Sequence, residues 1–277
     1  MVAGRSRRDD GRRDGSEAAA PTRRRLLGAV GAGALAGLGG CVGRVLGQSP
    51  TDTDRTIREA VTVRIDGESS TVRYGIPAAA YRSARDRDAA VPAATTAART
   101  AEFLDDLAAR LLDRAGSRAA GVRAAQSLTA ALPYVTDAAS TGHREYIRHP
   151  AETLVDGEGD CDDKAVLLSA LLSRPAFDCR TGLVMPRGHC ATLVARDDLP
   201  AGLVASAPLS VTLDGTAFVY LEAVGRVWPG DWARDYGERP LLAAYRDRWH
   251  VLDGGAMLDA AAAALDRGTP GIVTRYL

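Results

Sequence analysis

The chain has 277 residues, 46% of them hydrophobic, which suits one domain of ordinary size with tails. Its formal net charge is zero, but residues 1–40 hold eight of the 35 basic and four of the 35 acidic residues, which leaves a net charge of −4 beyond them. No basic patch stands out, so composition argues against a nucleic-acid partner.

The first 40 residues carry signals typical of export. Thr22 is followed by Arg23 and Arg24, then by one further residue and two leucines, which resembles the twin-arginine export signal. The apolar run at 26–40 is rich in glycine and has only 15 residues, which is too short for a membrane span. We therefore predict that residues 1–40 are a signal peptide.

The apolar run ends in "LGGC" at residues 38–41, which resembles a lipobox, where a peptidase cuts before a lipid-modified cysteine. The resemblance implies that Cys41 is the lipid attachment site and that the protein is anchored on the outer face of the cell membrane. The polar residues of 41–56 would form a tether. A signal peptide that is cleaved elsewhere, with Cys41 incidental, remains the alternative.

The exported part begins with hairpin and helix patterns. Residues 60–76 alternate apolar and polar positions on both sides of "DGES", which predicts a β-hairpin. Apolar periodicity predicts a helix over 98–114 and a second over 119–132, ended by Pro133. Prolines and glycines punctuate 133–160, which we expect to be irregular.

A further helix is predicted over 161–173, followed by short strands at 181–185, 189–195, 209–213 and 217–224. A tight turn at 186–188 would place Cys190 opposite Val184, so we expect Cys179 and Cys190 to be two buried thiols and not a disulfide. The C-terminal part reads as mixed, with an alanine-rich helix near 256–266. Helices followed by an antiparallel sheet predict an α+β fold.

The stretch "GEGDCDDKAVLLSALL" at 157–172 sets a thiol among carboxylates at the start of a helix. A calcium loop would use Asp156, Glu158, Asp160 and Asp162, but Cys161 stands where such a loop needs glycine and Leu167 where it needs glutamate. A zinc site at Cys161, Cys179, His189 and Cys190 lacks paired ligand spacing. A purely structural interpretation makes Asp160 an ordinary helix cap. We predict no metal and no other cofactor.

A nucleophilic interpretation uses the same cysteine. A helix N-terminus stabilises a thiolate, whereas neighbouring carboxylates raise the pKa of a thiol, so Cys161 would need a cationic imidazole nearby. His189 follows a tight turn and can serve. Glu222, which shares a strand face with Phe218 and Tyr220, can orient the imidazole. Asp231 and Asp214 are alternatives for this third position.

The motifs "GDCDDKAVLLSALL", "GHCATLVA" and "YLEAV" resemble the transglutaminase-like superfamily, which shares its core with papain-like cysteine peptidases. The resemblance covers about 120–230, within a single domain of 57–277. It implies a central helix bearing Cys161, packed on an antiparallel sheet that bears His189 and Glu222. Cys161 would be the nucleophile, His189 the base and acid, and Glu222 the orienting carboxylate, where many relatives carry aspartate.

The implied chemistry is thioester-forming acyl transfer on peptide or isopeptide amides of a peptide or protein substrate, more often resolved by water than by an amine. The Cys161 backbone N–H and the Gln126 side chain are candidate oxyanion donors. The competing hypothesis is a non-catalytic cell-surface binding module on the same fold. We expect the other histidines to be structural, and Trp228 and Trp232 to line a groove or the core.

Overall fold

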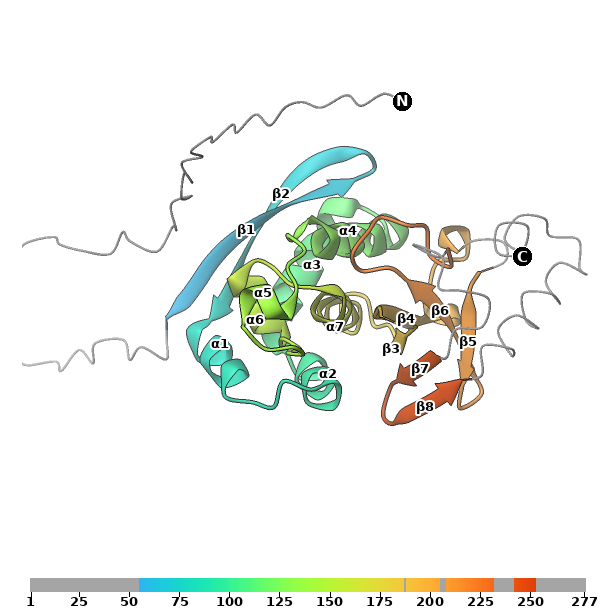
Figure 1. Ribbon diagram of the computed structural model, residues 1–277. Coiled ribbons are helices and arrows are strands. Elements are labelled where there is room, and N and C mark those ends of the chain that lie inside the picture. The colour runs from blue at the N-terminus through green and yellow to red at the C-terminus, as the bar shows by residue number, and fades with distance from the viewer. Residues whose placement is uncertain (1–54, 187, 205–207, 232–241, 253–277) are drawn as a thin grey trace, which may run out of the picture. The chain divides into compact units, whose positions relative to one another are not determined.

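A computed structural model describes residues 55–186, 188–204, 208–231 and 242–252 (Figure 1). All of them belong to the unit formed by residues 48–277. Arg23, Arg24, Cys41, Trp232 and the helix expected at 256–266 lie outside the described residues. Within the described ranges, every helix is too short or too polar to cross a membrane.

The described chain opens with the predicted hairpin, formed by β1 (Thr56–Ile65) and β2 (Glu68–Pro77). Asp66 and Gly67, with φ of 48° and 90°, make the two-residue turn, and left-handed conformations at both positions match the twist of a hairpin. Val61, Val63 and Val72 line the buried face. That face packs on α4 (Arg118–Ala131).

The helices are α1 (Ala78–Arg85), α2 (Val91–Arg99), α3 (Asp105–Ala115), α4, α5 (Asp137–Ser140), α6 (Pro150–Asp156) and α7 (Cys161–Leu172). The helix predicted at 98–114 is divided, because Ala101 leaves the helical conformation between α2 and a 3₁₀ turn that leads into α3. Its predicted apolar face is buried, as Leu104, Leu107 and Leu111 show. Gly116, with φ of 67°, ends α3.

The expectation of an irregular stretch at 133–160 is wrong, since α5 and α6 lie within it. Pro150 occupies the first turn of α6, His149 is the N-cap, and Glu152 closes a capping box by accepting from the His149 N–H. Gly157, with φ of 70°, ends the helix. The proline and glycine that suggested a loop are therefore the two ends of a short helix.

The six-stranded sheet has the order β5-β6-β4-β3-β7-β8 and is antiparallel throughout. Its strands are β3 (Thr181–Met185), β4 (Ala191–Ala195), β5 (Ser210–Leu213), β6 (Thr216–Leu221), β7 (Leu242–Tyr245) and β8 (Trp249–Leu252). Strands β3 to β6 match predicted segments, whereas β7 and β8 were not predicted.

The predicted register between β3 and β4 is off by one residue, since Val184 pairs with Ala191 and not with Cys190. The connection is longer than a tight turn, and β4 begins only at Ala191. Cys179 and Cys190 are nevertheless both buried free thiols, as predicted.

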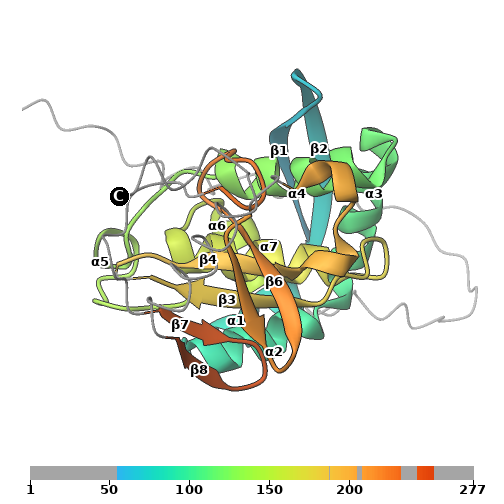
Figure 2. The ribbon, with the colours of Figure 1, turned by 90° about the vertical axis from the view of Figure 1, so that its right-hand side faces the viewer.

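Helix α7 lies between the sheet and the other helices (Figure 1). It packs on β3 and β4 on one side and on α2, α3, α4 and α6 on the others. Every residue of α7 from Asp163 onward is buried, and most of these residues are apolar. Figure 2 views the molecule from the side of the sheet, whose outer face carries a second apolar cluster that includes Leu193, Phe218 and Tyr220. The fold is α+β, as predicted.

Candidate active site

Cys161 is the first residue of α7 and is partly buried. Asp160 is the N-cap: its Oδ1 accepts from the Asp162 N–H at 3.3 Å, and its own N–H donates to Asp163 Oδ2 at 3.2 Å. This reciprocal capping box fixes where the helix begins and therefore where the thiol stands. The predicted cap and helix start are both present.

A buried ion pair between Arg148 and Asp163 stabilises the start of α7, where Cys161 lies. Arg148 is 2% exposed, and its Nη1 donates to Asp163 Oδ2 at 2.7 Å. The Arg148 backbone N–H donates to Asp163 Oδ1 at 2.6 Å, and Nη2 donates to Ser140 Oγ at 2.8 Å. Burial raises the pKa of Asp163 to about 6 in spite of Arg148, so the carboxylate is ionised at neutral pH and the charge of Arg148 is paired.

His189 and Glu222 form a buried pair at the end of the sheet nearest the start of α7. Nε2 of His189 lies 3.0 Å from Glu222 Oε2 and 3.2 Å from Oε1. The side chains are 7% and 0% exposed. Glu222 directly follows β6, and His189 precedes β4, which is the neighbour of β6. The two residues predicted to be partners are therefore hydrogen-bonded to one another.

Glu222 is held by more than the imidazole. Its Oε2 accepts from the Tyr220 hydroxyl at 2.5 Å, and its Oε1 accepts from the N–H groups of Ala223 and Val224 at 2.9 and 3.0 Å. Burial alone would raise the pKa of Glu222, but His189 and these donors hold it below its usual range. Glu222 is therefore an ionised acceptor, and its partner on the imidazole is Nε2.

The Cys161 sulfur has two polar contacts. The backbone N–H of Cys190, the residue after His189, and the hydroxyl of Tyr134 both bond to it and lower its pKa. Burial, then Asp162 and Asp160, outweigh them and raise the pKa of Cys161 to about 12. At neutral pH Cys161 is thus a thiol, bonded to the backbone N–H of the residue that follows His189, and it could act as a nucleophile only with a base to take its proton.

Gln126 is fully buried, and both of its amide hydrogens are engaged. Its Nε2 donates to the backbone oxygens of Glu222 and Val227, each at 2.9 Å, and its Oε1 accepts from Arg123. Gln126 therefore anchors the backbone that carries Glu222. A role as oxyanion donor would require it to give up one of these two bonds.

Three carboxylates near the start of α7 lie close enough to share an ion: oxygens of Asp137, Asp160 and Asp162 are all within 4.8 Å of one another. Two members of the calcium loop that was considered and rejected lie elsewhere, since Asp156 and Glu158 approach Arg148 at 3.5 and 4.0 Å. Burial and the neighbouring Asp160 raise the pKa of Asp162 well above its usual range. A protonated Asp162 can lie close to Asp160 without repulsion between two charges.

The remaining candidates have contacts with other groups. Asp214, an alternative third residue, is in the β5–β6 turn and pairs with Arg248 at 2.5 Å. His149 Nε2 contacts the Asp88 carbonyl oxygen at 3.0 Å. Trp228 is 45% exposed and lies under the Arg123 guanidinium. These contacts place Trp228 at the surface and not in the core.

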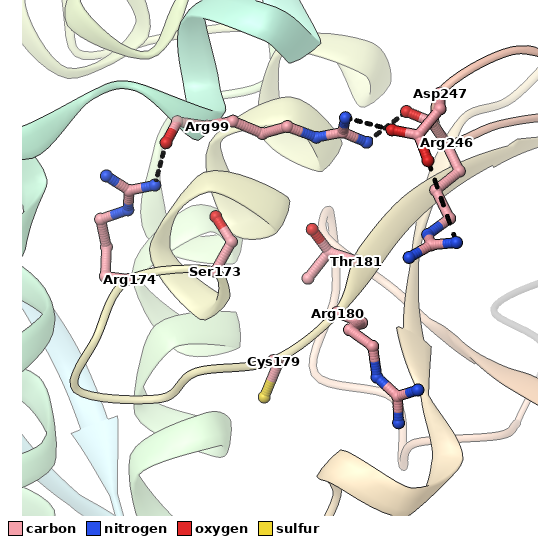
Figure 3. A pocket seen from close by; sticks show the side chains of 8 residues that line it. All are labelled: Arg99, Ser173, Arg174, Cys179, Arg180, Thr181, Arg246 and Asp247. Atoms are coloured by element: carbon pink, nitrogen blue, oxygen red, sulfur yellow. Dashed lines mark hydrogen bonds and ion pairs between the residues drawn. The ribbon is translucent and has the colours of Figure 1, made fainter.

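A cavity of about 240 Å³ lies at the other end of α7 (Figure 3). It is lined by Arg99, Ser173, Arg174, Cys179, Arg180, Thr181, Arg246 and Asp247. All four arginines have protein partners: Arg99 bonds Asp247, and Arg174 bonds the Arg99 carbonyl at 2.5 Å. Arg180 bonds Asp198 through two bonds at 2.9 Å, and Arg246 pairs with Asp247 at 3.9 Å. The cavity therefore marks where α2, α7 and the β7–β8 hairpin are tied together.

Three residues near the thiol were not predicted: Tyr134, Arg148 and Lys164. Lys164 is the only lysine in the chain and is 1% exposed, and its Nζ donates to the Leu132 carbonyl oxygen at 2.6 Å. For Lys164 the sequence did offer a signal, because a single lysine three residues after Cys161 lies one helical turn from the cysteine. The contacts of Tyr134 and Arg148 could not be predicted, because their partners come from distant parts of the chain.

A scan against protein-family models and a search of curated proteins both give no match. The interpretation of the site therefore depends on its residues and geometry.

Proposed function

We propose that the protein is a transglutaminase-like cysteine enzyme that forms a thioester on Cys161 and transfers an acyl group from a peptide or isopeptide amide, most often to water. The observation that carries the proposal is the buried His189–Glu222 pair, at 3.0 Å, together with the Cys161 thiol at the start of α7, which bonds the backbone N–H of Cys190, the residue after His189. Support for a transglutaminase or papain-like core comes from α7, which bears the cysteine and packs on β3 and β4 of the antiparallel sheet.

The proposed reaction starts from the Cys161 thiol, with His189 as the base. His189 Nδ1 takes the thiol proton while the sulfur attacks the amide carbonyl, and Glu222 stabilises the imidazolium that forms. The tetrahedral intermediate collapses when the C–N bond breaks, and the leaving amine takes the proton from His189. Water or a second amine then attacks the thioester with His189 as base, which releases the Cys161 thiol.

Alkylation by iodoacetamide at pH 7.5 tests the nucleophile. A thiol with an unassisted pKa near 12 reacts slowly at this pH, whereas one assisted by His189 reacts fast. We expect Cys161 to be alkylated at least 100 times faster than the buried Cys179 and Cys190 of the same chain. Cys161→Ser serves as the negative control, and equal rates at the three cysteines would contradict the proposal.

A non-catalytic surface binding module is the second candidate. The raised pKa of Cys161 favours it, since a protonated thiol is a poor nucleophile. A binding module would retain its partner in Cys161→Ser and would not be acylated by an activated ester. Loss of acylation in Cys161→Ser, starting from a reactive wild type, decides for the enzyme.

We also propose that the chain is exported by the twin-arginine route and anchored by a lipid on Cys41, on the strength of the "TRRRLL" and "LGGC" sequences. Metabolic labelling with a radioactive fatty acid tests the anchor. The label should be present in the wild type and absent from Cys41→Ala, while Arg23→Lys with Arg24→Lys should keep the chain inside the cell. Equal labelling of wild type and Cys41→Ala would refute the anchor.

A further inference from the structure

Tyr134 stands at the entrance to the candidate active site. Its side chain is 55% exposed although it is large and aromatic, and its hydroxyl is hydrogen-bonded to the Cys161 sulfur. It thus combines solvent access with direct contact to the proposed nucleophile. Its segment joins α4 to α5 and lies 27 residues before Cys161 in the chain.

The segment of Tyr134 is fixed to the cysteine loop. Tyr134 and Gly159 form a parallel β-bridge, in which the Gly159 N–H donates to the Pro133 carbonyl oxygen at 3.2 Å and the Val135 N–H donates to the Gly159 carbonyl oxygen at 3.3 Å. The loop that ends in Cys161 and the segment that carries the hydroxyl therefore move together. An exposed tyrosine held by backbone pairing has a defined position.

Lys164, a buried residue, also binds the segment that carries Tyr134. It follows Cys161 by three residues and so lies on the same side of α7. Its Nζ donates to the Leu132 carbonyl oxygen at 2.6 Å and lies 5.7 Å from the centre of the Tyr134 ring. A buried ammonium therefore contacts both the backbone and the ring of the tyrosine segment.

The proposed reaction needs a donor at this point. When the sulfur attacks a carbonyl, the oxyanion develops on the carbon bonded directly to the sulfur, so its donors must surround the thiol. The Cys161 backbone N–H, at the first position of α7, can be one of them. Gln126 is engaged by two carbonyl oxygens, and the Cys190 N–H points at the sulfur itself.

We infer that the Tyr134 hydroxyl is the side-chain donor of the oxyanion site, and that its hydrogen bond passes from the Cys161 sulfur to the oxyanion as the tetrahedral intermediate forms. The inference rests on the proposed function. In the step, the S–C bond forms, the carbonyl π electrons move to oxygen, and the thiol proton goes to His189. Tyr134 keeps its proton throughout: burial, and then the neighbouring Cys161, raise its pKa to about 12, so it acts as a donor and not as a base.

Two reactions of the same sulfur separate this role from a merely structural one. Acylation by an activated ester such as p-nitrophenyl acetate passes through an oxyanion, whereas alkylation by iodoacetamide is a displacement at carbon and forms none. Tyr134→Phe removes only the hydroxyl and keeps the ring beside Lys164. We expect it to slow acylation of Cys161 by roughly 10²–10³-fold and alkylation by less than about fivefold.

Tyr81→Phe in the full-length chain is the matched control, because the Tyr81 hydroxyl bonds Asp156 at 2.7 Å and not the sulfur. It should change neither rate. Equal slowing of both reactions in Tyr134→Phe would show that the tyrosine acts on the thiol alone and would overturn the inference, as would unchanged acylation. A wild-type chain that forms no thioester overturns the proposed function and this inference together, whereas failure in Tyr134→Phe alone overturns only the inference.

Discussion

Replacement of Glu222 by glutamine changes one atom and should disable the base. The backbone N–H groups of Ala223 and Val224 both donate to Oε1, so the amide oxygen of a glutamine must take that place. The amide NH₂ is then forced into the Oε2 place, 3.0 Å from His189 Nε2. The NH₂ group donates, so its shorter contact favours Nε2 as an acceptor, in competition with the amide oxygen in the Oε1 place, which accepts from Nε2–H at 3.2 Å. The ring proton therefore shifts toward Nδ1, the nitrogen that should take the thiol proton.

The loss of imidazolium stabilisation in Glu222→Gln can be estimated from the distance between His189 and Glu222. Two unit charges 3.0 Å apart interact by roughly 5 kcal/mol at an effective dielectric constant of about 20. The amide dipole retains part of this stabilisation of the imidazolium, so we expect a net loss of about 3–4 kcal/mol, or roughly 10²–10³-fold in the rate of Cys161 acylation. The rate is measured by mass spectrometry of the peptide that contains Cys161, after timed exposure to p-nitrophenyl acetate.

Glu152→Gln is the control, since Glu152 is an equally buried glutamate that bonds Tyr146 at 2.7 Å and not His189. It should leave the acylation rate within about twofold, because no group in the reaction loses a charge. A Glu222→Gln chain that folds and is acylated as fast as the wild type would refute the assignment of Glu222.

Three further outcomes follow from the surroundings of the site. Asp163→Asn leaves Arg148 buried without its closest charge, so thermal or urea unfolding should show a loss of about 3–5 kcal/mol in the free energy of unfolding. Asp106→Asn removes one partner of an exposed ion pair and should cost under about 1 kcal/mol. Similar losses for the two variants would contradict the importance of the buried pair. Gly159→Ala sets a Cβ 2.8 Å from the Asp163 side chain, and calorimetry should show destabilisation of roughly 1–3 kcal/mol; an unchanged Tm would show that the loop adjusts freely. In the folded protein the pKa of Glu222 lies below its ordinary value of 4.5, so the charge of Glu222 stabilises the fold above that pH. The difference in unfolding free energy between wild type and Glu222→Gln, measured by urea titration, should therefore shrink as the pH falls below 4.5. A difference that does not depend on pH would contradict the lowered pKa.

Local patterns predicted the elements whose signals are complete within a few residues. The hairpin follows from alternation around Asp66 and Gly67, and α7 follows from a cap and an apolar run. The short helix α6 was missed because Pro150 and Gly157 are as typical of helix ends as of loops. The β3–β4 register was off by one because the length of the connection, and not the strand pattern, decides it.

Some residues of the candidate site could be predicted from the sequence and others could not. Cys161, His189 and Glu222 each stand next to a turn or helix start, so their order along the chain predicted partners, and the structure brings His189 and Glu222 within 3.0 Å. The contacts of Tyr134 and Arg148 depend on how separate segments pack. Neither the β-bridge of Tyr134 to Gly159 nor the engagement of Gln126 by two carbonyl oxygens has a sequence pattern.

The most direct test of the central claim compares wild type with His189→Ala by site-resolved mass spectrometry after brief exposure to p-nitrophenyl acetate at neutral pH. We predict an acetyl thioester on Cys161 in the wild type and at least a 100-fold slower appearance of it in His189→Ala, with both chains equally folded by circular dichroism. A wild type in which Cys161 is not acetylated, or a His189→Ala chain acetylated at the same rate, would contradict the claim that Cys161 and His189 act together.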